Sequence, residues 1–215
     1  MTIRPTVMPQ PTDPGLFVRL ATPDDIPAIR DLMNECCDWL RTTGKGHNGG
    51  VDQWPDRFEL SEIQEEFEIG EFYIAYRDRN LAASFRFTDR PQWYSQIGSN
   101  DKFCKDIAAR MNITESELGN RLRQTGLDQP AIHWHSFAVK RALAGQALGY
   151  KLLEWGEAAT YQRGFQYLRL DCHHLNDRLR QYYIDAGFQS LHIIGENPFG
   201  GIFHKRLPHK EEFDA

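Results

Sequence analysis

The feature that most constrains the fold is a change of hydrophobic period within residues 131–188. Residues 131–139 form a strand pattern, and the apolar residues that follow recur at helical spacing. A second strand is predicted at residues 166–172, and Asn176, a residue favoured at helix N-caps, begins a second helix. That helix stops at Gly187, which suits the position after a helix C-cap. The order of strand, turn, helix, strand and helix predicts an α/β fold.

Small residues occupy the turn between the first of these strands and its helix. Gly145, Ala147 and Gly149 lie at the predicted helix start, where backbone N–H groups without intrahelical acceptors favour an anion. Small side chains allow a phosphate to approach the backbone closely. The turn contains neither G-x-G-x-x-G nor G-K-[ST]. The pattern indicates a phosphate or pyrophosphate site, although glycines near a helix start also serve as plain turn residues.

In these segments the chain resembles the GNAT superfamily, the acyl-CoA-dependent N-acyltransferases. The cofactor motif of that family, Q/R-x-x-G-x-G/A, corresponds in position to residues 144–149. The closing element of the family, an Asn-led helix with a tyrosine and then Gly-Phe, is matched by Asn176, Tyr183, Gly187 and Phe188. The resemblance implies a single GNAT-type domain, with a mixed and mostly antiparallel sheet flanked by helices and splayed between strands 4 and 5.

Two residues of the cofactor motif depart from the family pattern. Ala144 stands where the family has Gln or Arg, and Ala147 stands where it has its first Gly. These departures keep open the alternative of a non-catalytic acyl-CoA sensor or binding module. The cofactor-binding residues implied by the resemblance are Phe137, Ala138, Val139, Ala144, Gly145, Gln146, Ala147, Leu148, Gly149 and Asn176.

Transfer of an acyl group from a thioester to an amine needs a proton acceptor, oxyanion stabilisation and a proton for the leaving thiolate. In the resemblance, Val139 N–H faces the thioester oxygen and Tyr183 takes the position of the usual proton donor. A tyrosine with a pKa of about 10 stays neutral at neutral pH and can still protonate a thiolate. The alternative is that Tyr182 and Tyr183 only pack the amphipathic helix.

Two histidines are the candidates for the catalytic base. His133 and His135 lie two residues apart on one face of the predicted strand, alternating with Trp134 and Ser136. Imidazole is well suited to accept an ammonium proton near neutrality. Structural histidines are the alternative interpretation of both.

Other polar residues near the second strand allow further interpretations. Cys172, His173 and His174 are adjacent, a spacing that is poor for binding one ion, and no C-x-x-C or H-E-x-x-H is present, so no metal is expected. Asp171 and Arg169 share a face of the strand. We expect these two residues to form a structural pair, and the alternative is that Asp171 has a catalytic role.

The rest of the chain predicts the remaining elements of one domain over residues 17–207. Further strands are predicted at residues 17–20, 71–77, 81–87, 189–194 and 202–206, with helices after Thr22-Pro23 and over residues 59–69. Residues 91–130 predict a helical insertion before strand 4, in which Thr114 and Glu117 form a capping box. Asn80 is available for the positive φ of the turn at residues 78–80.

Composition limits the remaining classes of function. Residues 1–16 are expected to be a disordered lead-in and residues 208–215 a tail. The four cysteines show no paired spacing, which favours a reducing cytoplasm. The net charge of −5 argues against a nucleic-acid partner, and no apolar run is long enough to span a membrane.

The function predicted from the sequence is therefore N-acetylation by acetyl-CoA, through direct attack in a ternary complex. The expected partners are acyl-CoA and a small amine or a protein amine, and a homodimer is compatible with the sequence.

Overall fold

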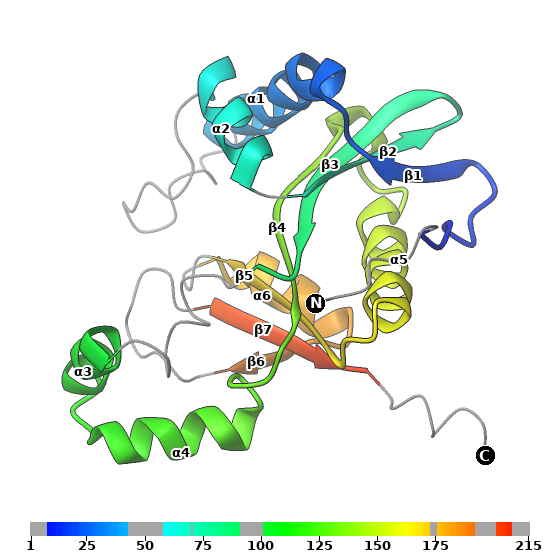
Figure 1. Ribbon diagram of the computed structural model, residues 1–215. Coiled ribbons are helices and arrows are strands. Elements are labelled where there is room, and N and C mark those ends of the chain that lie inside the picture. Colours follow the sequence, from blue (N-terminus) through cyan, green and yellow to red (C-terminus); the bar gives the residue numbers. More distant parts are fainter. Residues whose placement is uncertain are drawn as a thin grey trace, which may run out of the picture. The chain divides into compact units, whose positions relative to one another are not determined.

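The computed structural model describes residues 8–42, 58–69, 71–90, 101–172, 176–191 and 201–207. The chain divides into two compact units. The first contains Met1–Thr88 and Trp134–Gly164, and the second contains Asp89–His133 and Phe165–Ala215. Each unit packs helices against strands (Figure 1), which confirms the predicted α/β class. Within the described residues, no helix is long and apolar enough to cross a membrane.

The described residues of the first unit form four strands and three α-helices. Its sheet has the order β1-β2-β3-β4, with antiparallel pairing of β1 to β2 and of β2 to β3. Its elements are β1 (Leu16–Leu20), α1 (Ile26–Thr42), α2 (Leu60–Ile69), β2 (Phe72–Arg77), β3 (Asn80–Thr88), β4 (Ile132–Val139, of which Ile132 and His133 fall in the second unit) and α5 (Leu148–Gln162).

Two different cores cover the two faces of this sheet. On one face, side chains of α1 and α2 form a hydrophobic cluster with Phe72, Ile74 and Ala138. On the other face, the ring centroid of Trp155 on α5 lies 5.5 Å from that of Tyr73 and 5.4 Å from that of Phe85. The helices therefore lie on opposite sides of the strands, as Figure 1 shows for α1 and α5. The aromatic contacts fix α5, and residues 144–149, predicted to bind the cofactor, lie at the N-terminus of this helix.

The segment before β1 is held by side-chain contacts. The carboxamide of Gln10 accepts a hydrogen bond from Val18 N–H (3.2 Å) and donates one to Val18 O (3.1 Å), which satisfies the outer edge of β1. Pro9 O accepts from Trp155 Nε1 at 2.6 Å, and Asp13 accepts from Lys151 Nζ at 2.7 Å. The predicted disordered lead-in is therefore wrong for residues 9–15, because these polar contacts order a segment that has little apolar side-chain surface. Residues 1–7 lie outside the described part.

Within the part that the structure describes, the second unit contains three strands and three α-helices. Its strands have the order β5-β7-β6, and both pairings are antiparallel. Its elements are α3 (Asp101–Arg110), α4 (Glu115–Thr125), β5 (Tyr167–Cys172), α6 (Asp177–Asp185), β6 (Gln189–Leu191) and β7 (Gly201–Arg206). Strand β6 is described as far as Leu191, and the rest of the strand predicted at residues 189–194 lies outside the described part.

The insertion before β4 is helical, as its sequence predicts. Thr114 Oγ1 accepts from Glu117 N–H at 3.2 Å, and Glu117 Oε2 accepts from Thr114 N–H at 3.4 Å, which confirms the capping box. Helices α3 and α4 share a small hydrophobic cluster with Leu191 of β6. The buried guanidinium of Arg169 donates to Gly126 O (2.6 Å) and Gln129 O (2.8 Å), and so fastens the end of the insertion to β5.

Candidate active site

Strand β4 contains an irregularity at Ser136, which has a φ of 53°. In a regular strand, residues three apart point to opposite faces. Here the rings of Trp134 and Phe137 contact each other at 5.1 Å, and both contact Phe85. They therefore share a face, so one extra residue has entered the strand, as in a β-bulge. The regular alternation of side chains along β4 is therefore interrupted at Ser136.

Residues 137–139 follow this bulge and are fixed from the first unit. Ala138 is buried in the cluster with α1 and α2. The thiol of Cys36 on α1 donates to Val139 O at 3.6 Å, and burial raises the pKa of that thiol to about 11, so the donor proton is retained. Lys140 N–H donates to Ala82 O on β3 at 2.8 Å. The backbone of residues 137–139, which the resemblance predicts to bind the cofactor, is thus fixed by contacts with α1 and with β3. The role of Val139 N–H stays a prediction.

The turn after β4 is fastened to α1 by one carboxylate. Glu35 accepts hydrogen bonds from Arg141 N–H (2.8 Å) and from Lys140 Nζ (3.1 Å). The guanidinium carbon of Arg141 lies 3.7 Å from the ring centroid of Trp39, a cation–π contact. These contacts set the position from which the chain enters α5.

The N-terminus of α5 is open. Ala147 is the N-cap residue, with a φ of 55°, and Gly145 has a φ of 83°. Residues 144–147 are exposed, and no atom lies within 4 Å of the position that a Cβ on Gly145 would take. The first turn of α5 contains no acidic residue. The leading amides of a helix have no intrahelical acceptor, so Leu148 and Gly149 present N–H groups to an anion here.

The positive φ of Ala147 gives the family pattern a physical reason. A non-glycine residue in the left-handed region loses about 1–2 kcal/mol through the contact of its Cβ with the backbone. A glycine at this position avoids that contact. Ala147 adopts the conformation that a glycine would adopt, so the departure changes the cost of the turn and leaves its shape intact.

Tyr183 lies on α6 and is buried. Asn176 Oδ1 accepts from Leu179 N–H at 3.1 Å, which confirms the predicted N-cap and engages the oxygen of a residue predicted to bind cofactor. At the other end, Phe188 N–H donates to Tyr183 O at 3.0 Å, and Gly187 has a φ of 85°. The helix is therefore fixed at both ends around the tyrosine.

Burial raises the pKa of Tyr183 above its ordinary value, with further contributions from Cys172 and Asp171. The phenol is therefore neutral at physiological pH and keeps its O–H. A raised pKa also makes full proton release harder, so a hydrogen bond to a developing thiolate suits this tyrosine better than complete proton transfer.

The two candidate histidines differ in their surroundings. His133 is 2% exposed, and burial together with the Arg169 guanidinium lowers its pKa to about 3. It is neutral at physiological pH but accepts a proton weakly. His135 is half-buried. His133 belongs to the second unit with Asn176 and Tyr183, whereas His135 and residues 137–149 belong to the first.

Asp171 is a titratable group to which the sequence assigned mainly a structural part. It is half-buried on β5, and burial raises its pKa to about 6. Arg169 contacts backbone carbonyls of the insertion, as described above. Among the described residues, no group of three or more His, Cys, Asp or Glu is arranged to hold a metal ion. His173 and His174, on which the metal alternative depended, lie outside those residues.

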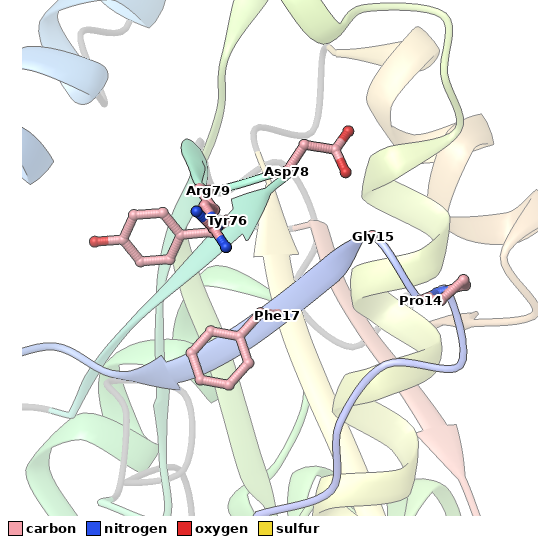
Figure 2. Close-up of a pocket in the computed structure, with 6 residues that line it drawn as sticks. All are labelled: Pro14, Gly15, Phe17, Tyr76, Asp78 and Arg79. Carbon is pink, nitrogen blue, oxygen red and sulfur yellow. The ribbon is translucent and has the colours of Figure 1, made fainter.

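A depression of about 460 Å³ lies elsewhere in the first unit, at β1 and the β2–β3 turn (Figure 2). Its lining residues are Pro14, Gly15, Phe17, Tyr76, Asp78 and Arg79. Phe17 and Tyr76 pair across the two strands, and Asp78 and Arg79 have φ values of 49° and 68°. The turn therefore places its positive φ before Asn80, in contrast to the prediction. The depression contains no predicted site residue.

Comparisons with known proteins identify the family of the chain. Residues 28–188 match the acetyltransferase (GNAT) family. The chain is 24% identical over 178 residues to the uncharacterized N-acetyltransferase YesJ of Bacillus subtilis strain 168, and the match covers 82% of this chain and 83% of YesJ.

Solved structures share the fold. A GNAT-family acetyltransferase from Listeria monocytogenes superposes with a TM-score of 0.61 at 24% identity, covering 89% of this chain and 95% of its own. A GNAT-family acetyltransferase from Streptococcus agalactiae superposes with a TM-score of 0.61 at 17% identity, and the match covers 93% of this chain and 100% of that protein. The structure of yncA from Salmonella typhimurium with its cofactor acetyl-CoA superposes with a TM-score of 0.52 at 14% identity, and the match covers 91% of this chain and 96% of yncA.

Proposed function

The chain belongs to the GNAT acetyltransferase family, and we propose that it transfers the acetyl group of acetyl-CoA to an amine by direct attack within a ternary complex. The observation that carries this proposal is the open N-terminus of α5. Gly145 and Ala147 turn the backbone at positive φ, and the small exposed side chains leave space above it. A pyrophosphate is the anion that this turn fits, because it accepts several N–H groups at once.

The bulge at Ser136 on β4 supports our proposal that the pantetheine arm of acetyl-CoA binds along this strand. A bulge in a strand leaves backbone groups outside the ladder and bends the strand locally. A residue other than glycine at positive φ within a strand is strained, and such strain concentrates at functional sites. Ser136 is such a residue, and the backbone of residues 137–139 that follows it would lie along the pantetheine arm.

When bound, acetyl-CoA supplies a thioester, an acyl carbon with a sulfur leaving group. The chain would contribute three functions around it. Val139 N–H would stabilise the developing oxyanion as a fixed donor. Tyr183, kept protonated by burial, would donate its O–H to the departing sulfur. The turn at residues 144–149 would hold the far end of the cofactor, so that binding energy there orients the reacting end.

The experiment that tests this function is release of free CoA thiol from acetyl-CoA in the presence of a panel of amines, including polyamines, amino acids, aminoglycosides and lysine peptides. An acetyltransferase releases thiol at a rate that depends on the amine. Saturable binding of acetyl-CoA with no thiol release above the rate without protein, for every amine, would instead support an acyl-CoA sensor.

A further inference from the structure

Asp171 differs from the other buried or half-buried carboxylates of the described residues. It is the fifth residue of β5, across from Ile202 of β7. Its carboxylate has no hydrogen bond or ion pair within the part of the chain that the structure describes. The carboxylate is nevertheless shielded from much of the solvent.

Carboxylates in comparable surroundings have cationic partners. Asp25 accepts from Arg19 at 2.7 Å, and this contact lowers its pKa to about 2. Asp13 accepts from both Arg77 (2.9 Å) and Lys151 (2.7 Å). Shielding a carboxylate without a partner costs free energy, so residues of this kind concentrate where a ligand supplies the missing partner.

We propose that Asp171 binds the ammonium group of the acceptor and takes its proton, so that the second unit carries the acceptor-activating residue. This inference rests on the proposed acetyl transfer. Asp171 and Tyr183 belong to the same unit and are close enough for the carboxylate to affect the phenol. One side chain therefore receives the proton of the nucleophile, and the other donates a hydrogen bond to the leaving group.

The electrostatic surroundings agree with this role. Burial raises the pKa of Asp171 to about 6, which makes it a stronger base than an ordinary carboxylate while it is still ionised at neutral pH. His133, with a pKa of about 3, is a much weaker proton acceptor. Among the described residues, Cys172 beside it and Tyr183 on α6 interact electrostatically with Asp171, Arg180 interacts with Cys172, Tyr182 interacts with Tyr183, and Arg169 lies two residues before Asp171 on β5.

The step balances in protons and electrons. The carboxylate of Asp171 takes one proton from the ammonium, which frees the nitrogen lone pair. That lone pair forms the new C–N bond with the acyl carbon, and the C–S bond breaks with its electron pair leaving on sulfur. The thiolate accepts a hydrogen bond from Tyr183 and then takes the second proton lost by nitrogen. Asp171, which is partly exposed, returns its proton to water.

The test compares Asp171→Asn with Asp185→Asn in the full chain. Asp185 lies on α6, is exposed and accepts from Gln181 at 2.8 Å, so it is a control for loss of one acidic charge. For Asp171→Asn we expect kcat/KM for the best amine to fall about 10²-fold or more, with loss of the acidic limb near pH 6. Acetyl-CoA binding should be unchanged. Asp171→Glu should restore part of the activity, and Asp185→Asn should resemble the wild type.

A stability measurement supplies a second readout. A carboxylate whose pKa is raised by folding contributes stability that is fully present below its unfolded pKa of about 3.9 and is lost as pH rises through its folded pKa of about 6. Asp171→Asn should therefore raise Tm at pH 8 relative to the wild type, and by more than at pH 5. An active wild type whose Asp171→Asn variant keeps kcat/KM within about threefold, with its acidic limb intact, would overturn the role of Asp171. Absence of thiol release from the wild type would overturn the acetyl transfer itself.

Discussion

The turn at the start of α5 and the neighbourhood of Tyr183 are built in opposite ways. The turn is exposed, its side chains are small, and what it offers to a ligand is backbone N–H in a left-handed conformation. Around Tyr183, on β5 and α6, the functional groups are side chains whose pKa values are displaced by burial. The first region therefore depends on backbone shape, and the second depends on the identity of individual side chains.

This difference explains why the departures from the family motif are tolerated by the structure. Ala144 is exposed and Ala147 still adopts a positive φ, so the backbone presents the same open helix end. A change of side chain in the second region would remove the proposed hydrogen-bond donor to the leaving thiolate or the carboxylate proposed to take the proton of the amine. The comparison predicts that substitutions divide cleanly between effects on binding and effects on turnover.

The largest effect is expected for Tyr183→Phe. Loss of the O–H should lower kcat about 10²-fold or more, because the developing thiolate loses its donor, while the affinity for acetyl-CoA stays nearly unchanged. Steady-state thiol release measures it, and Tyr182→Phe on the same helix is the control. Equal and small losses in both variants would make Tyr183 a packing residue.

A structural substitution in the second unit should have the next largest effect. Arg169→Met removes the donor to Gly126 O and Gln129 O, which leaves two carbonyls of the insertion without that partner. We expect a loss of about 2 kcal/mol in the free energy of unfolding, measured by urea denaturation. Arg121→Met, at an exposed position of α4, should change it by less than about 0.5 kcal/mol. A loss no larger than that of the control would show that Arg169 does not fasten the insertion.

For the turn of the first unit, Ala147→Glu should weaken acetyl-CoA binding on the order of tenfold, which is about 1.4 kcal/mol. The new carboxylate stands at the helix end where the pyrophosphate is proposed to bind. Ala147→Gln, of similar size and without charge, separates repulsion from bulk and should retain more affinity. Unaltered thermal stabilisation by acetyl-CoA in Ala147→Glu would place the cofactor elsewhere.

The smallest effect is expected for Ala147→Gly. Glycine relieves the strain of the positive φ, which is about 1–2 kcal/mol, and loses part of that gain through the larger entropy of its unfolded chain. The net change should be a stabilisation of at most about 1 kcal/mol in thermal unfolding, with acetyl-CoA affinity unchanged or slightly higher. A clear destabilisation would contradict the left-handed conformation of Ala147.

The sequence predicted those parts of the fold that depend on local chemistry. The Asn176 cap, the Thr114–Glu117 capping box and the helix end at Gly187 were all confirmed, because each depends on a few neighbouring residues. The bulge at Ser136 was missed, since serine carries no signal for a positive φ and the packing of Trp134 and Phe137 on one face imposes it.

The remaining differences also arise from contacts between distant residues. Order in residues 9–15 depends on Trp155 and Lys151, far along the chain. The raised pKa of Asp171 and the lowered pKa of His133 result from burial. The alternation of residues along a strand predicts which face a side chain lies on, but it does not predict how deeply that side chain is buried. Sequence patterns thus named candidate titratable residues, and burial distinguishes the raised pKa of Asp171 from the lowered pKa of His133.

Calorimetric titration of acetyl-CoA into wild type, Ala147→Glu and Tyr183→Phe tests the division between the two regions most directly. We predict that Tyr183→Phe binds with the wild-type Kd although its turnover is lost, and that Ala147→Glu binds on the order of tenfold more weakly. The opposite pattern, with affinity lost in Tyr183→Phe and retained in Ala147→Glu, would contradict the assignment of cofactor binding to the backbone of the turn and of chemistry to the side chains of β5 and α6.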